Sequence, residues 1–325
     1  MRYRHALVVG KFAPLHAGHQ FLIETALAEA ERVTVLCYAN PDFEAMPGEL
    51  RAGWIRELFP RVDVHVPTGG PPDRAAAAEH WTYLKNWLRA AGVEVDAVFS
   101  SESYGEPFAR ALGASVQHRM ADHGRTRLPI SGSRIRADVH AHRAWLNGRV
   151  YRHFVQMVVF VGAESTGKST LVEHLAREFD TAFVPEIGRA IWEQKGGQLD
   201  DEDYIEIAVR HRQAEAEAVA RANRYLFVDT NALTTLLLGH CYGQLRAVAP
   251  AVLLQYADEC RTRYEHHFVC GDEIAFEQDG VRENEAWRAR IQKLVLEDLA
   301  ARDIAYAMVS GTVQERSLQV RLAIS

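Results

Sequence analysis

The chain has 325 residues, of which 48% are hydrophobic and 25% are charged. This length exceeds what one core ordinarily supports, so we expect two domains, and the composition excludes disordered and fibrous proteins. A net charge of -6 argues against a general nucleic-acid scaffold. The chain has no apolar run of membrane-spanning length, and its first residues lack a secretion cleavage site. The four cysteines form no CxxC pair. We therefore expect a cytoplasmic protein without zinc, disulfides, nucleic-acid partner or membrane partner.

Short apolar runs alternate with longer amphipathic runs in the first half of the chain. The patterns predict strands at residues 5–9, 33–38, 62–66, 97–100 and 115–118, and helices at 20–31, 49–59 and 75–91. Strands this apolar, separated by helices, indicate a parallel sheet that is covered on both faces.

The same alternation of short apolar runs and longer amphipathic runs is found in the second half of the chain. Strands are predicted at 157–161, 182–185, 225–228, 267–270 and 304–309, and helices at 168–179, 201–222 and 285–301. No Gly/Ser linker separates the halves, and the boundary is expected near 149–154. The fold class is therefore α/β, with parallel sheets in two domains at residues 1–150 and 151–325.

Residues 162–169 (GAESTGKS) match the pattern G-x-x-x-x-G-K-[S/T] in full. Its glycines let successive backbone N–H groups point at phosphate oxygens, and the following helix adds its positive end. Lys168 would reach the β- and γ-phosphates, and the Ser169 hydroxyl would ligate Mg²⁺. A chance glycine turn is the alternative, but the flanking strand and helix favour ATP or GTP binding. The nucleotide-binding candidates here are Gly162, Glu164, Ser165, Thr166, Gly167, Lys168, Ser169 and Thr170.

Polar residues also follow two other predicted strands. Asp229 could hold Mg²⁺ through water or accept a proton from a substrate hydroxyl, although an Asp at this point also caps helices. Glu186 and Arg189 lie where ligands of open α/β sheets collect, and a surface ion pair is their alternative.

The segment 277–285 is polar and contains Gly280. Such a segment before a long helix is typical of a lid that closes over phosphates and delivers Arg282 or Arg288 to developing charge. An ordinary hinge loop is the alternative.

The first strand leads into residues 10–19 (GKFAPLHAGH), which open a helix. Lys11, His16 and His19 thus gather at the carboxyl end of the strand, and Gly18 lets the backbone approach closely. This arrangement would bind nucleotide phosphates and stabilise charge on the α-phosphorus. A metal site would need a third ligand that the neighbouring sequence lacks, whereas solvent-exposed histidines remain an alternative.

Residues 130–136 (ISGSRIR) open a second helix. Ser131 or Ser133 would cap it and bind phosphate, and Arg136 could clamp the β- and γ-phosphates. A Ser-capped helix with solvated arginines is the alternative.

These two motifs in this order resemble the HxGH nucleotidyltransferase superfamily. Their fusion to the segment GAESTGKST resembles the NadR family of bifunctional nicotinamide-nucleotide adenylyltransferases and ribosylnicotinamide kinases, over essentially the whole chain. The resemblance implies a Rossmann-like transferase domain followed by a nucleoside-kinase-like P-loop domain. It further implies phosphorylation of nicotinamide riboside by ATP, and adenylyl transfer from ATP to NMN that yields NAD and pyrophosphate.

The resemblance also assigns roles to particular residues. His16 and His19 match the phosphate-contacting histidines, and Lys11 matches the basic residue before them. Ser133 stands where the S-x-T-x-x-R element usually has Thr, which keeps the hydroxyl. The remaining matches are Gly10, Phe12, Gly18, Ser131, Gly132 and Arg136 in the transferase motifs, Asp229 at the acidic strand end, and Asp279, Gly280 and Arg282 in the lid pattern D-G-x-R.

Enterobacterial members of the family carry an additional DNA-binding domain before the transferase, which this sequence leads us not to expect. Two rival readings stay open: a fusion of the same folds that acts on another acceptor, and a nucleotide sensor with one silent domain. The sequence does not show which residues bind the nicotinamide ring, nor whether the chain forms homo-oligomers. The tryptophans considered for stacking are Trp54, Trp81, Trp87, Trp145 and Trp192, although helical tryptophans are more often core.

Overall fold

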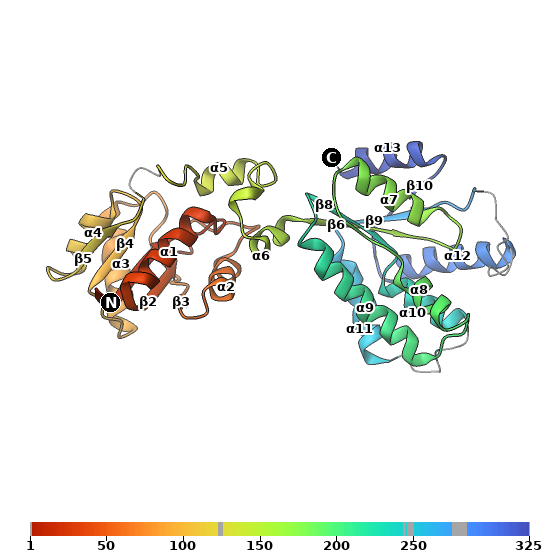
Figure 1. Ribbon diagram of the computed structural model, residues 1–325, viewed down its shortest axis with the longest axis horizontal. Helices are drawn as coiled ribbons and strands as arrows, with labels where there is room; N and C mark the ends of the chain where they lie inside the picture. The colour runs from red at the N-terminus through yellow and green to blue at the C-terminus, as the bar shows by residue number, and fades with distance from the viewer. Residues whose placement is uncertain (1, 123–125, 243–244, 246–249, 275–284, 325) are drawn as a thin grey trace. The chain divides into compact units, whose positions relative to one another are not determined.

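The computed structural model describes residues 2–122, 126–242, 245, 250–274 and 285–324. The chain divides into two compact units, Met1–His153 and Phe154–Ser325. Each unit contains a five-stranded parallel sheet with helices packed against it (Figure 1). The predicted fold class, two α/β domains with parallel sheets, is confirmed. None of the described helices is both long enough and apolar enough to cross a membrane.

The sheet of the first unit has the strand order β3-β2-β1-β4-β5. Its strands are β1 (Tyr3–Gly10), β2 (Ala30–Cys37), β3 (Asp63–His65), β4 (Ala97–Ser100) and β5 (Gln117–Met120). After β1 the chain moves outward through β2 and β3, and it then returns to place β4 on the other side of β1. The carboxyl ends of β1 and β4 therefore flank a topological switch point, where open α/β sheets bind ligands.

Helices cover both faces of this sheet. They are α1 (Ala17–Glu29), α2 (Gly48–Leu58), α3 (Ala77–Ala90), α4 (Gly105–Leu112), α5 (Gly132–Ala137) and α6 (Gly148–Tyr151), with 3-10 turns η2 (Arg143–Trp145) and η3 (Arg152–Phe154). Leu84 of α3 and Phe108 of α4 pack on one face against Leu7 and Val98. Helix α1 contacts β1, β2 and β4 and lies in front of the sheet in Figure 1.

The sheet of the second unit has the order β10-β9-β6-β8-β7. Its strands are β6 (Gln156–Val161), β7 (Phe183–Val184), β8 (Tyr225–Asp229), β9 (His266–Cys270) and β10 (Ala307–Val309). The helices are α7 (Lys168–Glu178), α8 (Ile187–Gln194), α9 (Asp201–Val219), α10 (Ala232–Cys241), α11 (Ala251–Arg263), α12 (Glu285–Ala301) and α13 (Val313–Ile324).

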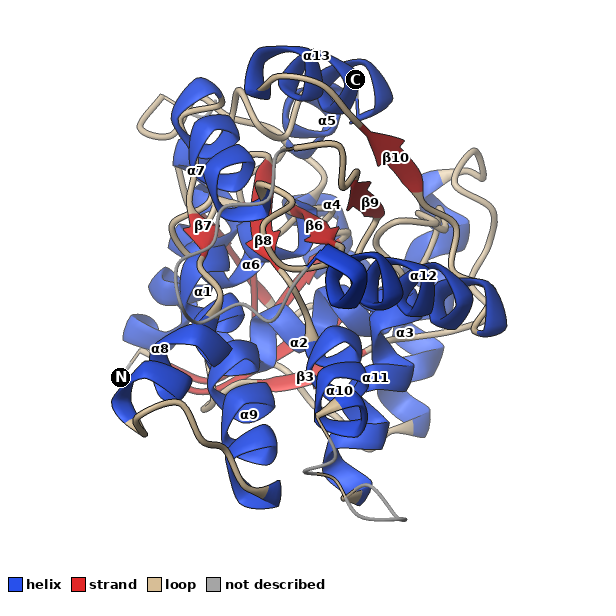
Figure 2. Cartoon of the chain, turned by 90° about the vertical axis from the view of Figure 1, so that its right-hand side faces the viewer, coloured by secondary structure: helices blue, strands red, loops and turns tan. Residues whose placement is uncertain are grey.

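Two layers of helix enclose this second sheet (Figure 2). On one side, Leu171 and Leu175 of α7 and Val320 of α13 pack against Phe160 and Phe227 of the strands. On the other side, α9, α10 and α11 pack against one another, and α9 also contacts β7 and β8. The strand ends that carry the polar motifs lie between these layers.

The structure differs from the sequence prediction in several elements. The first helix ends at Glu29 because Ala30 already begins β2, and β5 starts at Gln117, two residues later than predicted. Helices α4, α8, α11 and α13 were not predicted. Helix α13 shows the reason, because Leu318 and Leu322 remain 46% and 73% exposed. Its apolar residues therefore do not form the single stripe that marks an amphipathic helix.

The core of the second unit offers a matched pair of phenylalanines. Phe227 is fully buried, whereas Phe183, its partner in the β7–β8 register, is 36% exposed. We expect Phe227→Ala to lower the free energy of unfolding of this unit by about 3–5 kcal/mol, and Phe183→Ala to lower it far less. Hydrogen exchange of the β6 and β8 amides, followed by mass spectrometry, measures that free energy for this unit. Equal losses in the two variants would contradict the packing described.

Candidate active sites

The loop that follows β6 wraps around a small space at the edge of the sheet. Gly162 and Gly167 have φ angles of 134° and 77°, which side chains rarely tolerate. A Cβ atom on Gly162 would also lie only 3.0 Å from the carbonyl oxygen of Cys270. The loop leads directly into the N-terminus of α7, and a glycine loop followed by a helix N-terminus is a common arrangement for binding anions.

Lys168 lies within this loop and is only 8% exposed. Its ammonium donates to the carbonyl oxygens of Gly162 at 3.2 Å and Ala163 at 2.8 Å. The Thr166 hydroxyl also donates to Ala163, at 2.8 Å. An ammonium has three donors, so one N–H beyond these two bonds is available to a phosphate oxygen.

Ser169 and Asp229 come together from α7 and the end of β8. The Ser169 hydroxyl donates to Oδ2 of Asp229 at 2.5 Å. Asp229 is 1% exposed, and its Oδ1 has no hydrogen-bond partner among the described residues. A buried carboxylate oxygen left unbonded beside a hydroxyl fits a hard cation such as Mg²⁺, which prefers oxygen ligands. The chain continues from Asp229 into α10. The side chain that caps this helix is that of Asn231.

Glu186 follows β7 and occupies the position just before α8. Burial raises the pKa of its carboxyl group, and the charge of Lys168 opposes that rise. The carboxylates of Asp229 and Glu164 raise this pKa further. Glu186 is thus within electrostatic reach of the loop lysine, whereas Arg189 pairs along α8 with Glu193 at 3.0 Å.

The predicted lid is only partly described. Asp279, Gly280 and Arg282 lie outside the described residues. Arg288 is 6% exposed and donates to the backbone carbonyls of Asp272 and Ile274, at 2.7 and 2.8 Å. These bonds attach Arg288 to the backbone that follows β9, and its delivery to the transferred phosphate stays a prediction.

Two residues that the sequence analysis missed hold the loop in place. Gln292 accepts from the Ala163 N–H at 2.8 Å and donates to the Cys270 carbonyl at 2.9 Å. Arg316 donates to the carbonyls of Thr166, Gly271 and Gly311. Both lie on helices far along the chain, and no local motif marks them. The sequence feature that could have identified them is a polar residue on the buried face of its helix.

The two histidines of the first unit form a capping box at the start of α1. Nδ1 of His16 accepts from the Gly18 N–H at 3.1 Å, and Nδ1 of His19 accepts from the His16 N–H at 3.5 Å. The rings stack with centroids 3.8 Å apart. Because Nδ1 is an acceptor in each, each neutral ring carries its proton on Nε2 and presents it as a donor.

The distal ISGSRIR segment lies against this histidine turn. Arg136 donates to the carbonyl oxygen of Ala13 at 2.6 Å, and its guanidinium lies 4.7 Å from the centre of the Phe43 ring. A Cβ atom on Gly132 would be 2.8 Å from the same carbonyl, so only glycine allows this approach. Ser131 caps α5, and its hydroxyl lies 3.1 Å from that of Ser133. The two transferase motifs are therefore adjacent in space.

The remaining candidates of this turn are Phe12 and Lys11. Phe12 is buried, has a φ of 49°, and packs edge-on against His19 with ring centroids 4.9 Å apart. Its ring lies close to Gly10, where a Cβ atom would be 3.0 Å from it. Lys11 pairs with Asp73 at 2.5 Å, and both side chains are about half exposed. An exposed pair contributes about 1 kcal/mol at most, so a phosphate could compete for this ammonium.

Arg51 of α2 is a third residue that the sequence analysis missed. It is fully buried and donates to four carbonyls, those of Lys11, Tyr38, Ala39 and Met46. These carbonyls belong to the loops that follow β1 and β2. Burial lowers the pKa of this guanidinium, which nevertheless stays charged.

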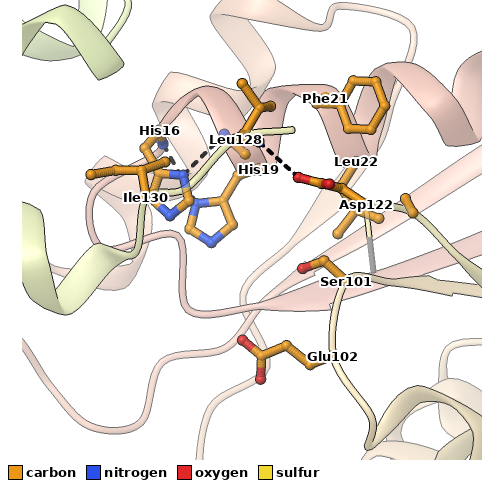
Figure 3. Close-up of a pocket in the computed structure, with 11 residues that line it drawn as sticks. His16, His19, Phe21, Leu22, Ser101, Glu102, Asp122, Leu128 and Ile130 are labelled. Atoms are coloured by element: carbon orange, nitrogen blue, oxygen red, sulfur yellow. Dashed lines mark hydrogen bonds between the residues drawn. The ribbon is translucent and has the colours of Figure 1, made fainter. Parts of the chain in front are cut away.

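A small pocket, with a cavity volume of about 40 Å³, opens beside the histidines (Figure 3). Its walls come from the start of α1, from Ser101 and Glu102 after β4, from Asp122 after β5, and from the segment that contains Ile130. It thus lies at the topological switch point between β1 and β4. Figure 3 shows the rings of His16 and His19 side by side, next to Ile130.

Replacement of Arg51 should destabilise the first unit, because four backbone carbonyls accept hydrogen bonds from this residue. We expect Arg51→Met to lower the free energy of unfolding of the first unit by about 2 kcal/mol or more, because buried acceptors lose their donor. Arg56→Met is the matched control, since Arg56 lies on the same helix but is half exposed. Hydrogen exchange of the β1 and β2 amides measures the free energy of unfolding of the first unit in both variants. Equal stability of the two variants would show that the carbonyls find other donors.

The chain is similar in sequence to a protein family and to two curated proteins. Residues 157–316 match the family model described as an AAA domain. The "Trifunctional NAD biosynthesis/regulator protein NadR" of Escherichia coli (strain K12) is 27% identical over 93% of this chain and 78% of the relative. The protein of the same name from Salmonella typhimurium (strain LT2) is 26% identical over the same shares.

Two solved structures share the fold over nearly the whole chain. One is described as NadR protein in complex with NR, with a TM-score of 0.70, 21% identity, and coverage of 98% of this chain and 95% of that one. The other, NadR protein in complex with NAD and AMP-PNP, has a TM-score of 0.68, 22% identity, and coverage of 99% and 95%. The chain is therefore similar to the NadR proteins in sequence over 93% of its length, and it shares the fold of the two NadR structures over nearly its whole length.

Proposed function

We propose that the chain is a bifunctional enzyme of NAD biosynthesis. The second unit phosphorylates nicotinamide riboside with ATP to give NMN, and the first unit transfers the adenylyl group of ATP to NMN to give NAD and pyrophosphate. The observation that carries the proposal is that, in each unit, a turn with glycine and basic residues leads from the carboxyl end of the central parallel strand into a helix N-terminus. Relatives named for NAD biosynthesis match across both units. Because both reactions consume ATP, we place the enzyme in the cytoplasm.

In the kinase unit, the loop after β6 holds the ATP phosphates. The N–H groups of the loop and the ammonium of Lys168 stabilise the negative charge on the transferred phosphoryl group. Ser169 and Asp229 would hold Mg²⁺, which neutralises phosphate charge when it is bound. Glu186 has a pKa raised by burial and lies near Lys168, so it is suited to accept the proton of the attacking 5′-hydroxyl.

In the transferase unit, the attacking group is the phosphate of NMN, which is already ionised at neutral pH. A strong general base is therefore unnecessary, and positioning and charge stabilisation supply the catalysis. The Nε2–H donors of His16 and His19 face the charge that develops around the α-phosphorus. Lys11 and Arg136 bind the remaining phosphate oxygens.

Two other functions remain to be distinguished from this one. The same folds could serve a different nucleoside and phosphate acceptor, or one unit could bind its nucleotide without turnover. Incubation with nicotinamide riboside, ATP and Mg²⁺, with chromatography of the products, separates all three. We expect NMN and then NAD. Accumulation of NMN alone would indicate a silent transferase, and the absence of both would refute the proposal.

Lys168 separates the two activities. We expect Lys168→Ala to reduce phosphorylation of nicotinamide riboside at least about a hundredfold, because an electrostatic contact to the transferred group is lost. Conversion of NMN to NAD should continue, since that site is built from the other unit. The exposed Lys293→Ala is the matched control. Unchanged phosphorylation in the Lys168 variant would refute the assignment of this loop.

His19 tests the transferase site. If its Nε2–H stabilises charge in the transition state, His19→Ala should lower kcat for NAD formation by a factor of about a hundred to a thousand, with little change in KM for NMN. If His19 only caps α1, the variant should lose about 1 kcal/mol of stability and keep its turnover. Steady-state kinetics beside a thermal melt decides between these roles. His142→Ala controls for loss of a histidine in the same unit.

A further inference from the structure

A buried histidine on α9 contacts the backbone at the end of β8, where Asp229 lies. His211 is 4% exposed, and its Nε2 lies 3.3 Å from the carbonyl oxygen of Asp229. A carbonyl oxygen only accepts hydrogen bonds, so Nε2 of His211 carries a proton and donates it. This histidine was not among the site residues predicted from the sequence.

The other side of the imidazole ring faces a buried carboxylate one helical turn further along α9. Nδ1 of His211 lies 3.5 Å from Oε1 of Glu215, which is 1% exposed. Glu215 accepts from Nε of Arg263 at 2.6 Å and from the Tyr264 hydroxyl at 2.5 Å. Burial alone would raise the pKa of this carboxyl group, but the bond from His211 and the charge of Arg263 lower that pKa, so Glu215 stays ionised. A carboxylate fixed in this way orients the ring of the histidine beside it.

The peptide group between Asp229 and Thr230 is held on both sides. Its carbonyl accepts from His211, and its N–H donates to the carbonyl oxygen of Phe160 on β6 at 2.9 Å. Thr230 has a φ of 67°, a left-handed conformation that β-branched residues rarely adopt. Such a conformation costs about 1–3 kcal/mol and persists only where surrounding contacts hold it. The two hydrogen bonds of the peptide group are contacts of this kind.

The orientation of this peptide group affects where the side chain of Asp229 points. One carboxylate oxygen accepts from the Ser169 hydroxyl at 2.5 Å, and the other has no hydrogen-bond partner among the described residues. Because a single methylene group separates an aspartate carboxylate from its backbone, rotation of the peptide group would move both oxygens. His211 therefore influences the carboxylate of Asp229 through the backbone.

We propose that His211, oriented by Glu215, is a positioning residue for the kinase reaction. It holds the peptide group after Asp229 so that this carboxylate stays beside the Ser169 hydroxyl, where the two would hold Mg²⁺. The inference rests on the proposed kinase function and adds to it a residue outside the phosphate loop. Removal of a residue that orients a metal-binding group typically lowers metal affinity or activity by about 10- to 100-fold. A residue that only filled the core would instead change the stability of the whole unit.

Two substitutions of His211 in the full-length protein separate its donor from its bulk. His211→Leu fills the space without a donor, whereas the side-chain amide in His211→Gln can still donate to the Asp229 carbonyl. We expect His211→Leu to lower kcat for phosphorylation of nicotinamide riboside about 10- to 100-fold, and to raise the Mg²⁺ concentration for half-maximal rate about tenfold. His211→Gln should stay within about fivefold of the wild type in both quantities. KM for nicotinamide riboside and the conversion of NMN to NAD should change by no more than about twofold in either variant.

Hydrogen exchange of the Thr230 amide gives a readout that needs neither metal nor turnover. This amide donates to Phe160, so its protection reports whether the peptide group stays in place. In His211→Leu we expect the Thr230 amide to lose about tenfold more protection than the amides of β8, and in His211→Gln we expect no such difference. His174→Leu is the matched control, because His174 lies in the same unit and its side chain is 36% exposed. The control should change none of these quantities.

The outcomes distinguish positioning from a structural role. A His211→Leu variant with the kcat, Mg²⁺ dependence and Thr230 protection of the wild type would overturn the inference. Equal loss of protection at Thr230 and along β8 in both His211 variants would also overturn it, because His211 would then stabilise the unit without positioning Asp229. If the wild-type protein phosphorylates no nicotinamide riboside, the proposed function fails, and the exchange comparison alone decides whether His211 holds the peptide group.

Discussion

In each unit, a buried arginine donates hydrogen bonds to inward-facing carbonyls of the turn that we propose binds phosphate. A loop that points its N–H groups at phosphate must point carbonyl oxygens into the protein, where each needs a donor. Arg51 supplies donors to the loops after β1 and β2, and Arg316 supplies them to the loops after β6, β9 and β10. A guanidinium suits this role because it has five donors and stays charged when buried.

The same arrangement fixes the positions of the side chains in both candidate sites. In the transferase unit, backbone N–H groups bond to Nδ1 of His16 and His19 and fix the orientation of both rings. In the kinase unit, Gln292 binds the loop at Ala163, and Lys168 bonds to two of the loop's own carbonyls. Side chains held in this way need little reorganisation when a phosphate binds, which is the condition for electrostatic catalysis.

The two units stabilise charge by different means, and the proposed chemistry explains the difference. Adenylyl transfer uses a nucleophile that is already ionised, and its turn offers imidazole, ammonium and guanidinium donors with no buried carboxylate among the predicted catalytic residues. Phosphorylation of a hydroxyl requires that a proton be removed, and the carboxylates of Glu164, Glu186 and Asp229 lie within electrostatic reach of one another and of Lys168 in the kinase unit. The raised pKa of Glu186 is a consequence of that crowding and of burial.

The sequence by itself determined the two α/β domains and the segments proposed to bind phosphate, because these depend on local features. Strand and helix periodicity, the glycines of GAESTGKS and the residues of GKFAPLHAGH act within a few positions of one another. Only the tertiary structure decided which distant residues complete the sites. Arg51, Gln292 and Arg316 lie on helices without a local motif, and their roles arise from parallel strands that bring separate loops to one edge of a sheet. Such contacts depend on packing between segments up to 150 residues apart, and no short-range pattern records them.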